Sequence, residues 1–150
     1  MGVLPPLAAV TTLALLCGWT ATGQAGRRLP VRAEPGARVL VPATPGAPTA
    51  ALVTLHNPGD LTDALTGASW GTAGVVTPKR HVHRAGAGSW EPVAELRVPA
   101  RGELRMSVDG ADLLIPRPPA LRPGDLLPLT LRFRHGPDLL VQATAVAPGG

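Results

Sequence analysis

Two histidines separated by a single valine are the first feature of this sequence that could do chemistry. Residues two apart on a strand project from the same face, so His81 and His83 would present two imidazoles side by side. Two imidazoles in that arrangement can chelate a divalent metal ion. The alternative is a solvated strand edge, because Lys79, Arg80 and Arg84 lie next to the pair and their charges oppose a bound cation.

One carboxylate could add a third ligand to the histidine pair. Asp112 would complete a site of two imidazoles and one acidic group, although it closely follows Asp109-Gly110, a dipeptide typical of tight turns, and could simply end that turn. Met106 is a weaker candidate. It alternates with Leu104 and Val108, which predicts a place in the hydrophobic core.

The sequence lacks the patterns of the common enzyme classes. No glycine loop ends in Lys-Ser or Lys-Thr, and no His-Glu-x-x-His occurs. Ser69 has the Gly-x-Ser-x-Gly spacing, but it falls in an expected strand with no helix after it, whereas a nucleophile elbow needs a strand-turn-helix context. We therefore expect no enzymatic activity. The net charge of +4 is spread along the chain, and Trp and Phe together number only four, so we expect no nucleic-acid binding either.

The N-terminal stretch indicates export. Residues 3–19 are apolar and uncharged, and small residues follow them, so residues 1–26 are expected to be a signal peptide or a membrane anchor. Cys17 follows a Leu-Ala-Leu-Leu run similar to a lipobox and is the candidate for lipidation. As the only cysteine it excludes an intrachain disulfide. We expect a monomer outside the cytoplasm, secreted or tethered to the outer face of the cytoplasmic membrane.

The elements that must position these residues are short strands. The 18 glycines and 18 prolines prevent long helices. Apolar residues alternate with polar ones in residues 127–133 and, after a Gly-Pro-Asp break, in residues 139–145, which predicts an antiparallel hairpin. Seven to nine such strands at turn spacings near ten residues predict an all-β sandwich over residues 38–146. Within the domain, residues 85–89 are expected to be a turn and residues 90–98 one continuous strand. Residues 27–37 are expected to be a linker and residues 147–150 a short tail.

Four segments of the domain resemble one known family. They are Leu52-Val-Thr-Leu-His-Asn-Pro-Gly-Asp60, Asp63-Ala-Leu-Thr-Gly-Ala-Ser69, the segment from Pro92 to Leu104, and Leu121-Arg-Pro-Gly-Asp-Leu-Leu-Pro-Leu-Thr-Leu-Arg-Phe133. In order and spacing they are similar to the PCu(A)C copper chaperones. The resemblance implies a cupredoxin-like Greek-key β-sandwich that delivers copper to extracytoplasmic targets, such as the copper centre of respiratory oxidases. A copper-acceptor protein at the membrane is the implied partner.

The family's copper ligands are only partly present. The family uses a histidine, a methionine several residues later and a His-x-Met pair, and soft thioethers with imidazoles suit monovalent copper. The first histidine falls on His83, with His81 as a close alternative, but the first methionine falls on Trp90 and the pair falls on Asp112 and Leu114.

The sequence therefore leaves two hypotheses. The first is a copper-chaperone-like protein with an altered site made of His81, His83 and Asp112. The second is a metal-free β-sandwich that binds a protein partner at the cell envelope.

Overall fold

The computed structural model describes residues 26–72 and 74–149. Within these residues the chain forms twelve strands and no helix, which confirms the all-β prediction. It follows that no helix in this part of the chain is long and apolar enough to cross a membrane. The number of strands exceeds the seven to nine expected, because the chain also forms several strands of only two to four residues. Cys17 and the predicted leader lie outside the described residues. The strands are β1 (Arg32–Ala33), β2 (Arg38–Leu40), β3 (Thr49–Leu52), β4 (Thr54–Asn57), β5 (Asp63–Trp70), β6 (Gly74–Arg84), β7 (Ala87–Pro92), β8 (Leu96–Val98), β9 (Gly102–Arg105), β10 (Ala111–Ile115), β11 (Leu126–Phe133) and β12 (Leu139–Val146).

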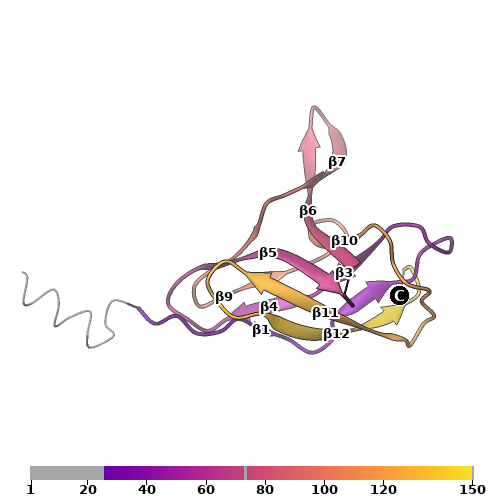
Figure 1. The fold of residues 1–150 in the computed structure, drawn as a ribbon. Helices are drawn as coiled ribbons and strands as arrows, with labels where there is room; N and C mark the ends of the chain where they lie inside the picture. The colour runs from indigo at the N-terminus through magenta and orange to yellow at the C-terminus, as the bar shows by residue number, and fades with distance from the viewer. Residues whose placement is uncertain (1–25, 73, 150) are drawn as a thin grey trace, which may run out of the picture.

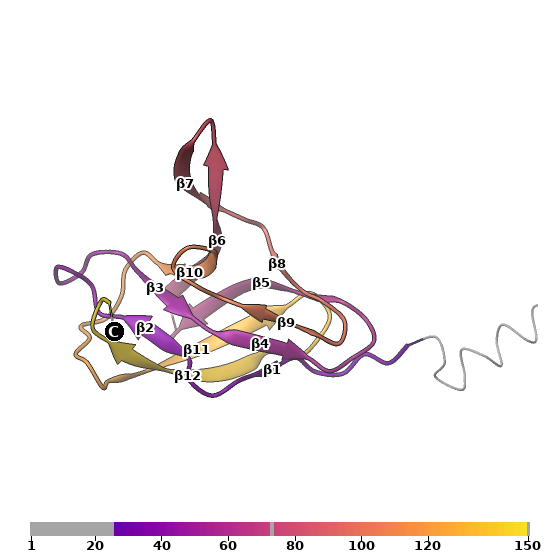
Figure 2. The ribbon, with the colours of Figure 1, turned by 180° about the vertical axis from the view of Figure 1, so that it is seen from behind.

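The larger of the two sheets closes on itself. Its strand order is β7-β6-β10-β3-β2-β12-β11-β5-β8, and an additional pairing joins β6 to β5. This closure leaves β7 and β8 as the terminal strands of the order, each paired with one neighbour in this sheet. β2 and β12 pair in parallel and the other neighbours are antiparallel. A small sheet of order β1-β4-β9 lies beside this body (Figure 2).

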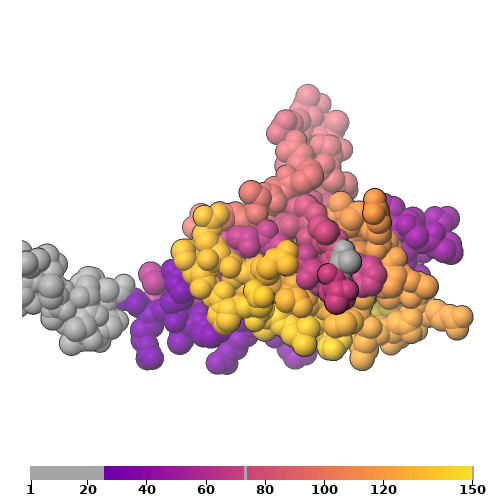
Figure 3. Space-filling view, viewed as in Figure 1, coloured from indigo at the N-terminus to yellow at the C-terminus, as the bar shows by residue number. Residues whose placement is uncertain are grey.

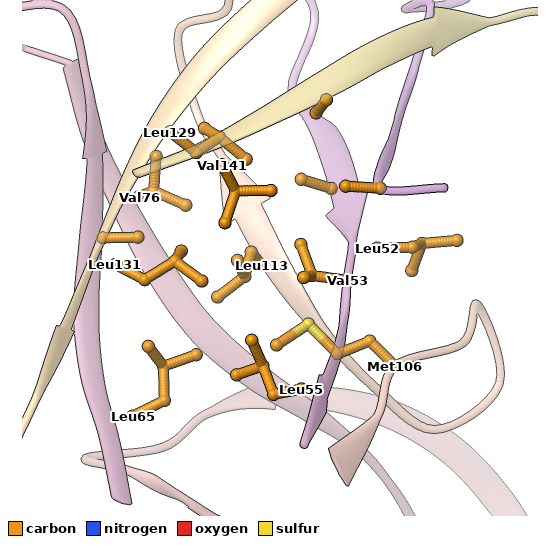
Figure 4. Packing of buried hydrophobic residues seen from close by; sticks show 14 of the residues in the cluster. Leu52, Val53, Leu55, Leu65, Val76, Met106, Leu113, Leu129, Leu131 and Val141 are labelled. Carbon is orange, nitrogen blue, oxygen red and sulfur yellow. The ribbon is translucent and has the colours of Figure 1, made fainter. Parts of the chain in front are cut away.

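The C-terminal hairpin supplies much of the core, as its alternation predicts. On β11 every second residue is buried, and Leu129 pairs with Val141 on β12. These side chains meet Leu113 of β10 and Leu55 of β4 inside the barrel (Figure 4). Met106 is 4% exposed and packs in the same cluster, which confirms its predicted core role.

Residues 27–37 contribute to the folded body. β1 lies in this stretch and pairs with β4, with Arg32 opposite His56. Val31 and Ala37 are buried among the core residues. The chain passes from β3 in the large sheet to β4 in the small one through the buried Val53, so this residue joins the two sheets.

A two-stranded arm stands away from the body (Figures 1 and 3). β6 is eleven residues long: it begins against β5, continues against β10 and ends paired with β7 alone. We call residues 79–92 the arm. After β7 the chain leaves the arm and re-enters the sheet as β8, beside β5. The continuous strand expected from residue 90 to residue 98 is therefore interrupted at residues 93–95.

Candidate functional site

The arm is a hairpin closed by a two-residue turn. Arg84 pairs with Ala87 across the strands, and between them Ala85 and Gly86 have φ angles of 51° and 78°. Positive φ at both central residues is what a type I′ hairpin turn requires, and that turn matches the natural twist of paired strands. The turn expected over residues 85–89 is therefore limited to its first two residues, and the remainder belongs to β7.

The two histidines lie side by side on one face of the arm. The ring centroids of His81 and His83 are 4.6 Å apart and the planes meet at 77°. Gly88 makes room for this arrangement, because a Cβ atom there would lie 2.5 Å from Nε2 of His81. The backbone N–H of His81 donates to the carbonyl oxygen of Gly110 at 2.9 Å, which ties this part of the arm to the segment before β10.

An indole and an ammonium extend the histidine face toward the body. Trp90 is the cross-strand partner of His81, and their ring centroids are 4.7 Å apart. The ammonium of Lys79 lies 4.3 Å from the centroid of the Trp90 ring. A cation over an indole face at this distance is attracted by the ring quadrupole. Lys79, His81 and His83 are alternate residues of β6, so the three side chains follow one another along one face.

Asp112 ends this row on the neighbouring strand. It pairs with Lys79 in the register of β10 and β6, and its Oδ1 lies 3.6 Å from Nζ of Lys79. The residue is only 2% exposed, and within the described part of the chain Oδ1 accepts no hydrogen bond. Burial raises the pKa of the Asp112 carboxyl to about 6, against the attraction of Lys79, which lowers it.

The structure brings together some of the residues singled out in the sequence. His81 and His83 are in contact, and Trp90 lies beside His81. Asp112 is on the same side of the sheet, but the side chain that faces it is Lys79. Among residues 26–72 and 74–149, no group of three or more His, Cys, Asp or Glu side chains gathers as a metal site.

Lys79 is the site residue that sequence reasoning did not identify. The sequence indicates only that its charge opposes a bound metal ion. The alternation of Lys79, His81 and His83 already places the lysine on the histidine face. Its contact with Asp112 depends on the pairing of β6 with β10, which residue spacing alone does not give.

Comparison with known proteins identifies the family. The family model LpqE-like, named for a lipoprotein, matches residues 27–145. The chain belongs to the LpqE-like family.

Three solved structures have the same fold. The copper-bound PCuAC domain from PmoF2 is 16% identical, with a TM-score of 0.64 over 81% of this chain and 97% of that one. The apo PCuAC domain from PmoF1 is 18% identical, with a TM-score of 0.66 over 81% and 98%. CuI-DR1885 from Deinococcus radiodurans is 30% identical, with a TM-score of 0.56 over 76% of this chain and 80% of that one. No curated protein matches.

These similarities confirm two predictions made from the sequence. The resemblance to the PCu(A)C family is confirmed by the family model together with the structures of PCuAC domains. The cupredoxin-like β fold is confirmed by the same structures, which align with most of the described residues. Two of these solved structures are described with copper, the PCuAC domain from PmoF2 and CuI-DR1885.

Proposed function

We propose that this LpqE-like protein is an extracytoplasmic copper-chaperone-like protein that carries copper on His81 and His83. The observation that carries the proposal is the contact of two imidazoles, 4.6 Å apart, on a hairpin that stands away from a PCuAC-like body. Two similar solved structures support it, the copper-bound PCuAC domain from PmoF2 and CuI-DR1885. We propose no enzymatic role.

The donor set fits copper but differs from a thioether site. Imidazole nitrogen is a good ligand for copper, whereas thioether sulfur selects the monovalent ion. The one methionine among the described residues, Met106, is buried in the core and is not available to the arm. Copper held by imidazoles without sulfur should therefore favour the divalent state more than it does in a methionine-containing site.

The position of the histidines suits transfer of the ion to another protein. His83 is exposed near the tip of the arm, and β7 covers only one edge of β6 there. An acceptor protein can thus approach His83 without any rearrangement of the barrel. We propose that the acceptor is a membrane protein, and the copper centre of a respiratory oxidase is the candidate that the family resemblance supplies.

Tethering to the membrane is part of the proposal. The leader over residues 1–26 would direct export, and lipidation of Cys17 would hold the domain at the outer face of the cytoplasmic membrane. The name of the matching family, which refers to a lipoprotein, supports this. Intact mass of the native protein tests it, because lipidation at Cys17 removes the preceding residues and adds acyl chains.

Copper titration of the full-length protein tests the central proposal. We expect His81→Ala and His83→Ala each to weaken copper binding by about tenfold or more. Each variant removes one of the two ligands, and a loss of about 1.4 kcal/mol in binding free energy corresponds to a tenfold loss of affinity. His135→Ala is the matched control, because it removes an imidazole from the turn after β11. If neither arm variant differs from the wild type, the proposed site is wrong.

One observation favours a second function. The ammonium of Lys79 already lies between Asp112 and Trp90, and Arg80 and Arg84 add positive charge to the arm. These cations favour a metal-free module that binds an envelope protein through the arm. Under this alternative, the protein retains no copper after dialysis and unfolds at the same temperature with or without a chelator.

A further inference from the structure

The Lys79 ammonium lies between two groups that attract a cation, the Asp112 carboxylate and the Trp90 ring. A carboxylate oxygen of Asp112 lies 3.6 Å from Nζ on one side, and the Trp90 ring centroid lies 4.3 Å away on the other. A buried carboxylate and an aromatic face both attract a cation. Trp90 also contacts His81, so the ammonium and the nearest imidazole share one neighbouring ring.

The choice of residue at this position is unusual for this chain. Lys79 is the only lysine in the sequence, and the other basic residues are arginines or histidines. A lysine ammonium is a compact point charge on a flexible stem, whereas the guanidinium of arginine is broad and planar. The Lys79 side chain is 15% exposed, so its ammonium has a route to solvent that the Asp112 carboxylate, at 3%, does not have.

Departure of the ammonium would leave an uncompensated charge. Oδ1 of Asp112 accepts no hydrogen bond within the described residues, and Lys79 is the cation that lies against it. A buried carboxylate that loses its only cationic neighbour is strongly disfavoured. Lys79 should therefore leave its place readily only when another cation arrives nearby.

We propose that Lys79 is an exchangeable internal cation that limits the affinity of the arm for copper. The inference rests on the proposed function. A copper ion held at His81 and His83 repels the Lys79 ammonium across Trp90. When Lys79 turns toward solvent, the copper ion takes its place as the positive charge that compensates the Asp112 carboxylate. Copper binding and retention of Lys79 in its place therefore oppose each other, and by linkage each weakens the other by the same factor.

The unique lysine allows a direct test in the unaltered protein. An amine-specific reagent modifies only the Nζ of Lys79 and the N-terminal amine, and peptide mass spectrometry separates the two. We expect the modification rate of Lys79 to rise severalfold when the full-length protein is saturated with copper, while the rate at the N-terminus stays constant. An unchanged or lower rate at Lys79 in the copper-loaded protein would overturn the inference.

A charge-neutral variant tests the same inference from the other direction. Lys79→Gln removes the ammonium with a side chain of similar length, and Arg80→Gln removes one charge from the adjacent residue, which alternation places on the opposite face of β6. We expect Lys79→Gln to bind copper about tenfold more tightly than the wild type, and Arg80→Gln to change the affinity less than threefold. If Lys79→Gln is unstable because Asp112 is left unpaired, the double variant Lys79→Gln/Asp112→Asn removes both charges and should still bind more tightly than Asp112→Asn alone.

The outcomes separate this inference from the proposed function. If the wild type binds copper, and Lys79→Gln and Arg80→Gln have the same copper affinity as each other, the inference fails and the proposed function stands. If only the Lys79→Gln protein binds copper, the inference stands and the proposed function fails. If none of the proteins binds copper, both fail.

Discussion

Replacement of Asp112 by asparagine should make the metal-free protein more stable at neutral pH. Burial outweighs the attraction of Lys79 and raises the pKa of this carboxyl from 3.8 to about 6. The fold therefore favours the protonated acid over the carboxylate. The contribution of protonated Asp112 to the stability of the folded state is fully present below the unfolded pKa of 3.8. It is lost as the pH rises through the folded pKa. Asparagine imitates the neutral acid at every pH.

The magnitude follows from the shift in pKa. About two pKa units correspond to about 3 kcal/mol of free energy between the charged and neutral forms, which is an upper limit for the effect. Between pH 4 and pH 7 the wild type should lose up to this amount of stability from Asp112, and Asp112→Asn should not. At pH 7 the variant should unfold at a temperature higher by up to roughly 10 °C, by the usual relation for domains of this size.

Urea and thermal unfolding from pH 4 to pH 7.5 in the presence of a chelator measure this effect. Asp109→Asn is the control, because Asp109 is an exposed carboxylate in the turn just before β10. Two results would contradict this expectation: Asp112→Asn destabilises the protein at pH 7, or its stability depends on pH in the same way as that of the wild type. The first result would mean that the pair with Lys79 outweighs the cost of burial, and the second that the two effects offset each other.

Three further predictions concern the arm and the body. Gly88→Val should weaken copper binding by about tenfold, because its Cβ would collide with the His81 ring, while Ser89→Ala should not; the copper titration measures both. Asp63→Ala should cost about 2–4 kcal/mol in urea unfolding, since its buried carboxylate accepts backbone N–H groups from Ala64, His135 and Gly136. An unchanged midpoint would show that the β11–β12 turn does not need this carboxylate. Leu131→Ala should cost about 2–5 kcal/mol through the cavity it leaves, yet the folded fraction should bind copper like the wild type.

The sequence predicts the body of the protein better than the arm. Strict alternation in β11 and β12 is enough to predict their buried faces, because each strand has one buried face and one solvent-exposed face. In the arm both faces of β7 are exposed or nearly so, and the composition Ala-Gly-Ser-Trp carries no such signal. The sequence prediction therefore extended the turn through Ser89 and merged the second strand with β8.

The candidate site shows the same division. The contact of His81 with His83 follows from their spacing on one strand, so it could be predicted from the sequence. The contact of Asp112 with Lys79 joins residues 33 positions apart and requires the register of β10 against β6. A local pattern cannot specify that register, so Asp112 was considered a third ligand or a turn residue and its partner was not identified.

X-ray absorption at the copper edge, on full-length protein loaded with one equivalent of copper, shows which side chains hold the ion. We expect two coordinated imidazoles and no sulfur in the wild type, with one imidazole remaining in either His81→Ala or His83→Ala. Sulfur in the coordination shell, or the same shell in all three proteins, would contradict it.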